Sequence, residues 1–252
     1  MHINANSCVD GCGYDPVVGE ADAALVADVR AALRAEADPE RAVATRRYMK
    51  SVMPYLGVRL PTVRLLTRAA ERAHPLTTRP AMIATVRLLW QGADYREERY
   101  AATELLNTAS ARRLRSMDLL PLYCELIVDG AWWDHVDAVS QLVGELLAAF
   151  PAETNPVLRA WSRDSDMWLR RSAIIAQVGA KTDTDLDLLA DVIEPNLADR
   201  EFFIRKAIGW ALRDYAWTDP EWVRSYVAAH EARLSALSRR EAVKNIRDGA
   251  HR

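Results

Sequence analysis

The sequence is poor in the features that strands, secretion and membrane insertion require. Glycine provides only 10 of 252 residues, below the usual ~7%, and alternating β-branched patterns are scarce. No apolar run approaches the ~20 residues that cross a bilayer, and residues 1–20 lack the basic and apolar segments of a signal peptide. The three cysteines, Cys8, Cys12 and Cys124, are too few for a disulfide framework. We therefore expect a helical, cytoplasmic protein with reduced thiols and no membrane association.

Metal ligands are also scarce. Cys8 and Cys12, together with His2, are the best candidate set, but they lie in an acidic segment without periodic structure. A structural metal site draws its ligands from fixed spacings within folded elements. We expect no metal and no other cofactor.

The formal net charge of −2 does not indicate a polyanionic partner, but the charge is unevenly distributed. Residues 1–40 carry eight acidic side chains against Arg30 and Arg34, a sum of −6, so the remaining 31 basic and 27 acidic residues carry +4. Of the 33 basic residues 29 are arginine, whose planar guanidinium suits contact with phosphate. Codon bias explains an arginine excess equally well. The charge permits a nucleic-acid partner without establishing one.

From residue 19 onward, apolar residues recur with the period of an α-helix, and proline or glycine marks the breaks. We predict a flexible tail over residues 1–18 and a single helical-repeat domain over residues 19–252. Its expected helices cover residues 20–36, 40–53, 62–74, 80–91, 96–108, 118–129, 132–148, 156–163, 166–179, 184–194, 200–215, 219–232 and 237–247. Thirteen short helices without strand patterning predict an all-α fold.

An aromatic residue opens three successive predicted helices at equal intervals. Trp133, Trp168 and Phe203 are 35 residues apart, each followed by polar residues and a small apolar stripe. A displaced earlier copy begins at Tyr95. A period near 35 with two helices per unit is typical of HEAT-like α-solenoids. Such repeats stack into a curved array, and the second helix of each pair usually lines its concave face.

The densest polar and aromatic cluster is Trp132-Trp133-Asp134-His135-Val136-Asp137. Trp133 and Asp137 are four residues apart and share one helical face, whereas Trp132 lies about 100° around the helix. A carboxylate in an otherwise apolar helix needs a charged partner or a functional cleft. Asp137 is therefore the leading candidate for a chemical role.

Later repeats supply cations near further aromatics. Lys206, Trp210 and Arg213 fall on one face of a predicted helix, and Arg170 and Arg171 lie on the preceding one. Basic groups interleaved with aromatic rings suit a nucleic-acid groove. A solvated charged face over buried tryptophans fits the same spacing, so both interpretations stay open here.

Several stretches, taken together, resemble one known family. They are RYMKS (47–51), LGVRLPTVRLL (56–66), WWDHVD (132–137), WLRRSAI (168–174), EFFIRKAIGWALRDYA (201–216) and LSRREAVKNI (237–246). In this order and spacing they resemble the AlkD-like DNA alkylation repair glycosylases over about residues 40–247. The resemblance implies hydrolysis of the N-glycosidic bond of cationic N3- or N7-alkylated purines in duplex DNA. It implies a concave face that binds DNA, and base excision repair without base flipping and without a metal. We expect the protein to act as a monomer.

The resemblance also assigns roles to individual residues. Asp137 matches the catalytic aspartate, and Trp133 and Trp210 match the tryptophans that flank the lesion and its deoxyribose. Tyr48 matches a tyrosine of the same cleft, and Arg171 matches an arginine that contacts the DNA backbone near the lesion. We further expect DNA binding by three other cations, Lys50, Lys206 and Arg213.

The residues suit this chemistry on physical grounds. A purine alkylated at N3 or N7 is cationic and leaves without a general acid. As the bond breaks, positive charge grows on the deoxyribose, and an anionic Asp137 stabilises that charge and orients water. Indole rings add cation–π attraction of ~0.5–2 kcal/mol each.

Three other functions remain open at this stage. A non-catalytic helical-repeat module that binds DNA would tolerate the loss of Asp137. A specialised glycosylase for bulky genotoxin adducts, serving self-resistance, would keep the same aspartate and tryptophans and differ in cleft width. A solenoid that binds RNA or protein needs the aromatic and arginine face but no buried carboxylate.

Overall fold

The computed structural model describes residues 19–246, and all regular secondary structure within this range is helical. The tail expected over residues 1–18, with Cys8 and Cys12, lies outside it. The α-helices are α1 (Ala23–Ala35), α2 (Pro39–Met49), α3 (Leu60–Ala73), α4 (Arg79–Gln91), α5 (Arg96–Leu105), α6 (Ala109–Arg113), α7 (Leu120–Gly130), α8 (Trp133–Ala149), α9 (Pro151–Trp161), α10 (Met167–Ile175), α11 (Leu186–Ile193), α12 (Phe202–Tyr215), α13 (Pro220–Ala229) and α14 (Ala236–Ala242). The all-α fold class is confirmed.

Every predicted helix has an observed counterpart, and two differences have clear physical causes. Helix α9 begins at Pro151, five residues before the predicted start, and Pro156 lies inside it. The buried side chains of Leu158 and Trp161 stabilise this helix despite the hydrogen bond that Pro156 removes. Helix α6 is missing from the prediction because five residues, capped by Thr108, are too short to show a period.

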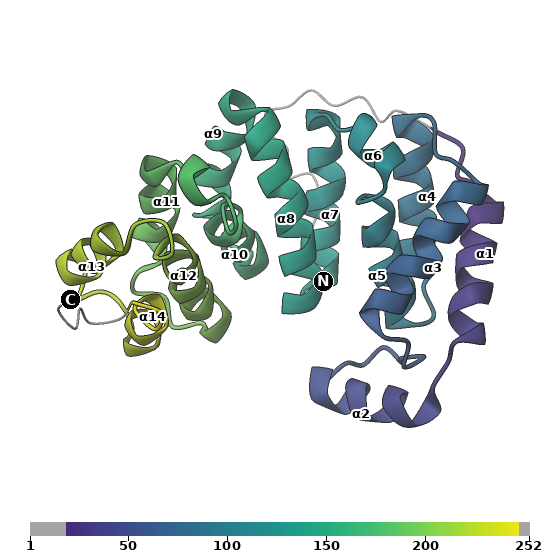
Figure 1. Cartoon of the computed structure of the whole chain (residues 1–252), viewed down its shortest axis with the longest axis horizontal. Coiled ribbons are helices and arrows are strands. Elements are labelled where there is room, and N and C mark those ends of the chain that lie inside the picture. The colour runs from purple at the N-terminus through teal and green to yellow at the C-terminus, as the bar shows by residue number, and fades with distance from the viewer. Residues whose placement is uncertain (1–18, 247–252) are drawn as a thin grey trace, which may run out of the picture. The chain divides into compact units, whose positions relative to one another are not determined.

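The described chain divides into two compact units, which we call the N-terminal unit (residues 19–119) and the C-terminal unit (residues 120–246). In the N-terminal unit α3 and α4 both pack against α5, and all three helices pack against α1. Helix α2 lies across the end of the unit at which α3 and α5 begin (Figure 1). Met49 is the only buried residue of α2, so this helix depends on polar anchors.

The main anchor is Glu97, a buried carboxylate in the first turn of α5. It accepts hydrogen bonds from the backbone N–H groups of Leu56, Gly57 and Val58 at 2.8–3.2 Å. Gly57 has a φ of +83°, and a Cβ there would lie 2.2 Å from the carbonyl oxygen of Asp38. The close approach allowed by glycine, together with the carboxylate of Glu97, holds the loop after α2 against the unit.

The C-terminal unit is built from helix pairs that repeat along the chain. Helix α7 packs against α8, α9 against α10, and α13 against α14, whereas α11 packs against α9 and α10. Helices α8, α10, α12 and α14 pack in a row (Figure 1). Three of these helices begin at Trp133, Met167 and Phe202, close to the predicted period of 35. Helical repeats are therefore confirmed, whereas the concave DNA-binding face remains a prediction.

Two further expectations concern cysteine and membranes. Cys124 on α7 is buried, whereas Cys8 and Cys12 lie outside the described residues, so the expectation of reduced thiols stays a prediction. No helix within residues 19–246 has the length and apolar character needed to cross a bilayer.

Candidate active site

The carboxylate of Asp137 is paired with the guanidinium of Arg171. Nε of Arg171 lies 2.8 Å from Oδ1 of Asp137, and Nη2 lies 2.9 Å from Oδ2. Nη1 of Arg171 donates to the carbonyl oxygen of Phe203 at 2.6 Å. Asp137, Arg171 and Phe203 come from α8, α10 and α12, so one hydrogen-bonded chain connects three successive repeats.

The period of the repeats brings these groups together. Asp137, Arg171 and Lys206 are each the fifth residue of their helices, α8, α10 and α12. Residues at equivalent positions of stacked repeats face the same side of the row. An anion and two cations therefore line up on adjacent helices, and the first two form a bidentate pair.

Asp137 is buried deeply enough for its pKa to shift, but part of its side chain remains open to solvent. The side chain of Asp137 is 18% exposed, whereas that of Arg171 is 6% exposed. Burial raises the pKa of Asp137, and this effect outweighs the opposing hydrogen bond and positive charge of Arg171, while Asp134 adds a smaller rise. A perturbed carboxylate with a specific partner and partial access to solvent is typical of a functional site.

An aromatic cluster lies beside this pair. The ring centroids of Trp132, Trp168 and Phe203 are 5.0–6.2 Å apart, and Arg171 lies over the Phe203 ring at 5.9 Å. The cluster thus uses Trp132 where the sequence repeat pointed to Trp133. Ala131, with a φ of +38°, turns the chain between α7 and α8, and Trp132 follows it as the extended N-cap before helical Trp133.

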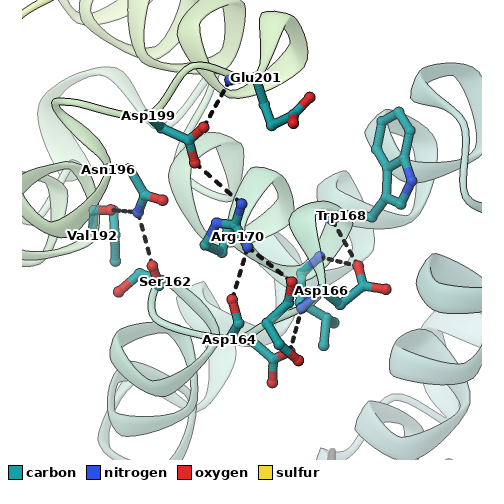
Figure 2. A network of polar contacts seen from close by, with 11 residues as sticks. Ser162, Asp164, Asp166, Trp168, Arg170, Val192, Asn196, Asp199 and Glu201 are labelled. Atoms are coloured by element: carbon teal, nitrogen blue, oxygen red, sulfur yellow. Dashed lines mark hydrogen bonds and ion pairs between the residues drawn. The ribbon is translucent and has the colours of Figure 1, made fainter. Parts of the chain in front are cut away.

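The first turn of α10, which presents Arg171, is fixed by a polar network (Figure 2). Asp166 caps the helix by accepting from the N–H groups of Trp168 and Leu169. Arg170 donates to the carbonyl oxygen of Asp164 at 2.8 Å and to the carboxylate of Asp199 at 3.1 Å. Arg170 therefore anchors the loop before α12 to α10.

Trp133 and Trp210 are both half-buried, so part of each indole is open to solvent. Trp133 begins α8 one turn before Asp137, as its spacing predicted. Trp210 lies on α12, two turns beyond Phe203. Their expected contacts with lesion and sugar remain predictions.

Lys206 and Arg213 share one acidic partner, Glu241 on α14. Nζ of Lys206 lies 3.2 Å from one carboxylate oxygen, and Nη1 of Arg213 contacts the other. Burial raises the pKa of Glu241, but the hydrogen bond from Lys206 and the charges of Lys206, Arg213 and Lys244 together lower it. The two cations on either side of Trp210 therefore have one compensating anion.

Tyr48 and Lys50 belong to the N-terminal unit, at the end of α2. The side chain of Tyr48 is 77% exposed, and exposed Lys50 caps the helix in the left-handed conformation with a φ of +52°. Exposure at this helix end leaves both side chains available to a partner, and their role in DNA binding remains a prediction.

Sequence reasoning missed three contributors to the site. Glu241 looked like one of many charged residues, although its place in LSRREAV, a stretch shared with the family, was a signal. Asp166 is the N-cap of α10, a position where aspartate is common, and Asp199 lies two residues before Glu201, the N-cap of α12. Their link to Arg170 depends on tertiary structure.

Fold and site together define an all-helical repeat protein with an aspartate–arginine pair beside an aromatic cluster. The family described as DNA alkylation repair enzyme matches residues 29–246, and the chain belongs to this family. A solved structure described as a predicted DNA alkylation repair enzyme from Enterococcus faecalis is similar, with 29% sequence identity and a TM-score of 0.72. The match covers 85% of this chain and 98% of that chain. No curated protein matches the sequence.

Proposed function

We propose that this protein is a DNA glycosylase that hydrolyses the N-glycosidic bond of cationic N3- or N7-alkylated purines in duplex DNA. The observation that carries the proposal is Asp137, a partly exposed carboxylate held by both oxygens in the guanidinium of Arg171. A fixed anion stabilises a deoxyribose that becomes cationic as the base leaves. Because the alkylated base is already charged, it departs without a general acid.

In this proposal Arg171 acts as a positioning residue. Its three bonds to Asp137 and Phe203 fix the carboxylate across three helices. A bidentate pair restricts rotation of the carboxylate more than a single hydrogen bond does. Arg171 is 5% exposed, so this geometry favours orientation of Asp137 over the phosphate contact that the family resemblance implies.

The partner in the proposed reaction is duplex DNA. Trp133 and Trp210 would contact the cationic lesion and sugar, and Tyr48, Lys50, Lys206 and Arg213 would contact the strand around them. The protein would act as a cytoplasmic monomer in base excision repair, with residues 19–252 as one catalytic domain and without moving the base into a pocket. Cation–π attraction to a charged base gives the selectivity, because a neutral base gains neither that attraction nor easy departure.

The decisive experiment is a base-release assay on methylated duplex DNA with the wild type and Asp137→Asn. We expect release of 7-methylguanine or 3-methyladenine to slow by about 10- to 1000-fold in the variant, the range of a lost electrostatic contact. DNA binding, measured in parallel, should fall only modestly. Equal release rates for the two proteins would remove Asp137 from catalysis, and no release by either would refute the glycosylase.

A further inference from the structure

A cavity beside the first turns of α12 has no part in the reaction proposed above. Its volume is about 330 Å³, and its lining includes three arginines, Arg200, Arg205 and Arg233, together with Asp199 and Ser235. All of these residues belong to the C-terminal unit. We propose that this cavity is a phosphate-binding site that holds a backbone phosphate of the DNA strand near the lesion, an inference that rests on the proposed function.

The charges of the cavity leave a net positive surplus. Arg233 is paired with Glu194, and Asp199 is paired with Arg170. By contrast, Arg200 and Arg205 have no acidic partner within residues 19–246. Two guanidinium groups that have no acidic partner can bind an external anion. Phosphate suits them because its oxygens match the spacing of the guanidinium N–H donors.

Arg205 carries the strongest indication. Its Nε is buried and has no hydrogen-bond partner in the described part of the chain. Leaving a buried donor unsatisfied is unfavourable, and such a group needs an explanation. A phosphate oxygen would satisfy it after a small rotation of the half-buried guanidinium, whereas an apolar ligand would not.

The walls of the cavity are held in place before any ligand binds. The carboxylate of Asp199 accepts from Arg170 at 3.1 Å and from the N–H of Glu201 at 2.8 Å (Figure 2). The lining residue Ser235 pairs with the hydroxyl of Ser238 at 2.8 Å, and that hydroxyl donates to the carbonyl oxygen of Arg205 at 2.9 Å. A prearranged site loses little entropy when it binds an anion.

The position of the cavity favours a phosphate that is part of a strand. Arg205 is adjacent to Lys206, and the preceding residues of the same turn include Phe203, whose carbonyl oxygen is bonded to Arg171. The exposed Arg200 provides an open rim. A strand with its lesion at Asp137 would therefore place a neighbouring phosphate at this edge of α12. A free phosphate ion offers the same chemistry, and the experiment separates the two sources.

The test measures binding of a fluorescent, undamaged duplex at several salt concentrations. Three variants are compared with the wild type: Arg200→Ala, Arg205→Gln and, as a matched control, Arg159→Ala, which removes an arginine from an exposed ion pair with Asp191. We expect Arg200→Ala and Arg205→Gln each to weaken binding by about tenfold and to lower the salt slope by about 0.9. The control should leave the slope near the wild-type value. Since Arg200 is exposed, its variant tests the site even if Arg205→Gln fails to fold.

A second arm uses inorganic phosphate alone, followed by phosphorus NMR. DNA binding that weakens in the two site variants but not in the control supports the backbone phosphate. Tight binding of inorganic phosphate that is lost in the variants, with DNA binding unchanged, would overturn it in favour of a small-molecule site. Unchanged binding of both ligands would overturn the site altogether. Base release by the wild type and by Asp137→Asn is measured separately and tests the glycosylase activity. The phosphate site can therefore be refuted without refuting the glycosylase, and the reverse also holds.

Discussion

Arg171 contacts both carboxylate oxygens of Asp137, with Nε 2.8 Å from Oδ1 and Nη2 2.9 Å from Oδ2. The two residues come from adjacent helical repeats and form the only bidentate ion pair of the candidate site within residues 19–246. The pair has two opposing effects on Asp137. Burial raises the pKa of the carboxyl, and the hydrogen bond and charge of Arg171 lower it.

The first prediction concerns the pH dependence of base release. Only ionised Asp137 stabilises a cationic sugar, so activity falls as pH drops through the pKa of this residue. The pKa of Asp137 is raised from its ordinary value of 3.8. We therefore expect the acid limb of the pH–rate profile, where activity falls with decreasing pH, to lie at a higher pH than an exposed aspartate would give. Arg171→Gln removes the interactions that lower the pKa, so we expect the limb to move to still higher pH.

The measurement is single-turnover base release across a pH series. Arg170→Gln is the matched control, because Arg170 is paired with Asp199 and not with Asp137. A purely structural role for Arg171 would slow release at all pH values and leave the limb where it is in the wild type. That outcome would contradict the link between the two residues.

The second prediction concerns Trp210. If its indole faces the cationic sugar, Trp210→Leu should slow release by about 2- to 30-fold at saturating DNA, the equivalent of ~0.5–2 kcal/mol of cation–π attraction. Trp210→Phe should keep part of the rate, since its ring is smaller but still aromatic. The matched control is Trp217→Leu, which alters an indole that is 74% exposed after the end of α12. Equal rates for the Leu and Phe variants would argue against a cation–π role.

The fold was predictable because its helices are marked locally. Proline lies in the first turn of α2, α3, α4 and α13, and an aspartate caps α1 and α10. All six helices begin within three residues of their predicted starts. The apolar period did not predict the start of α9, because tertiary packing there overrides the local preference of the sequence. Pro156 was taken for a boundary, although buried neighbours keep it inside α9.

The site was predictable in part. Asp137 stood out because a carboxylate in an apolar helix requires a partner, and the structure supplies Arg171. The identity of that partner depends on the stacking of α8 on α10, which no local pattern contains. The same limit applies to Glu241, whose contacts with Lys206 and Arg213 join α14 to α12. Sequence reasoning thus found the charged and aromatic residues but could not pair them across helices.

The third prediction concerns Glu97 and the attachment of α2. In the wild type, two carboxylate oxygens of Glu97 accept hydrogen bonds from three backbone N–H groups. Glu97→Gln replaces them with a neutral amide, whose single oxygen cannot accept all three hydrogen bonds. We expect the free energy of unfolding to fall by about 3 kcal/mol, the range for hydrogen bonds to a buried charge. Chemical denaturation measures this, with Glu40→Gln on the exposed surface of α2 as the control. Equal losses in the two variants would show that the buried carboxylate is not an anchor.

The last prediction concerns the balance of charge around Trp210. Glu241 has a lowered pKa and so remains ionised at neutral pH, where it compensates one of the two positive charges of Lys206 and Arg213. Glu241→Gln removes that anion while keeping similar volume. We expect the variant to bind duplex DNA about three- to tenfold more tightly at low salt, with a steeper salt slope, because both cations become available to phosphate.

Glu231→Gln is the matched control for this variant, since Glu231 forms an exposed ion pair with Arg239 beside α14. It changes the net charge of the protein by the same amount, so any general effect of charge on DNA binding appears in both. Tighter binding in Glu241→Gln alone would identify Lys206 and Arg213 as DNA contacts that Glu241 restrains. Weaker binding in Glu241→Gln at every salt concentration would mean that the carboxylate orients the two cations, since losing their orientation then outweighs the gain in charge.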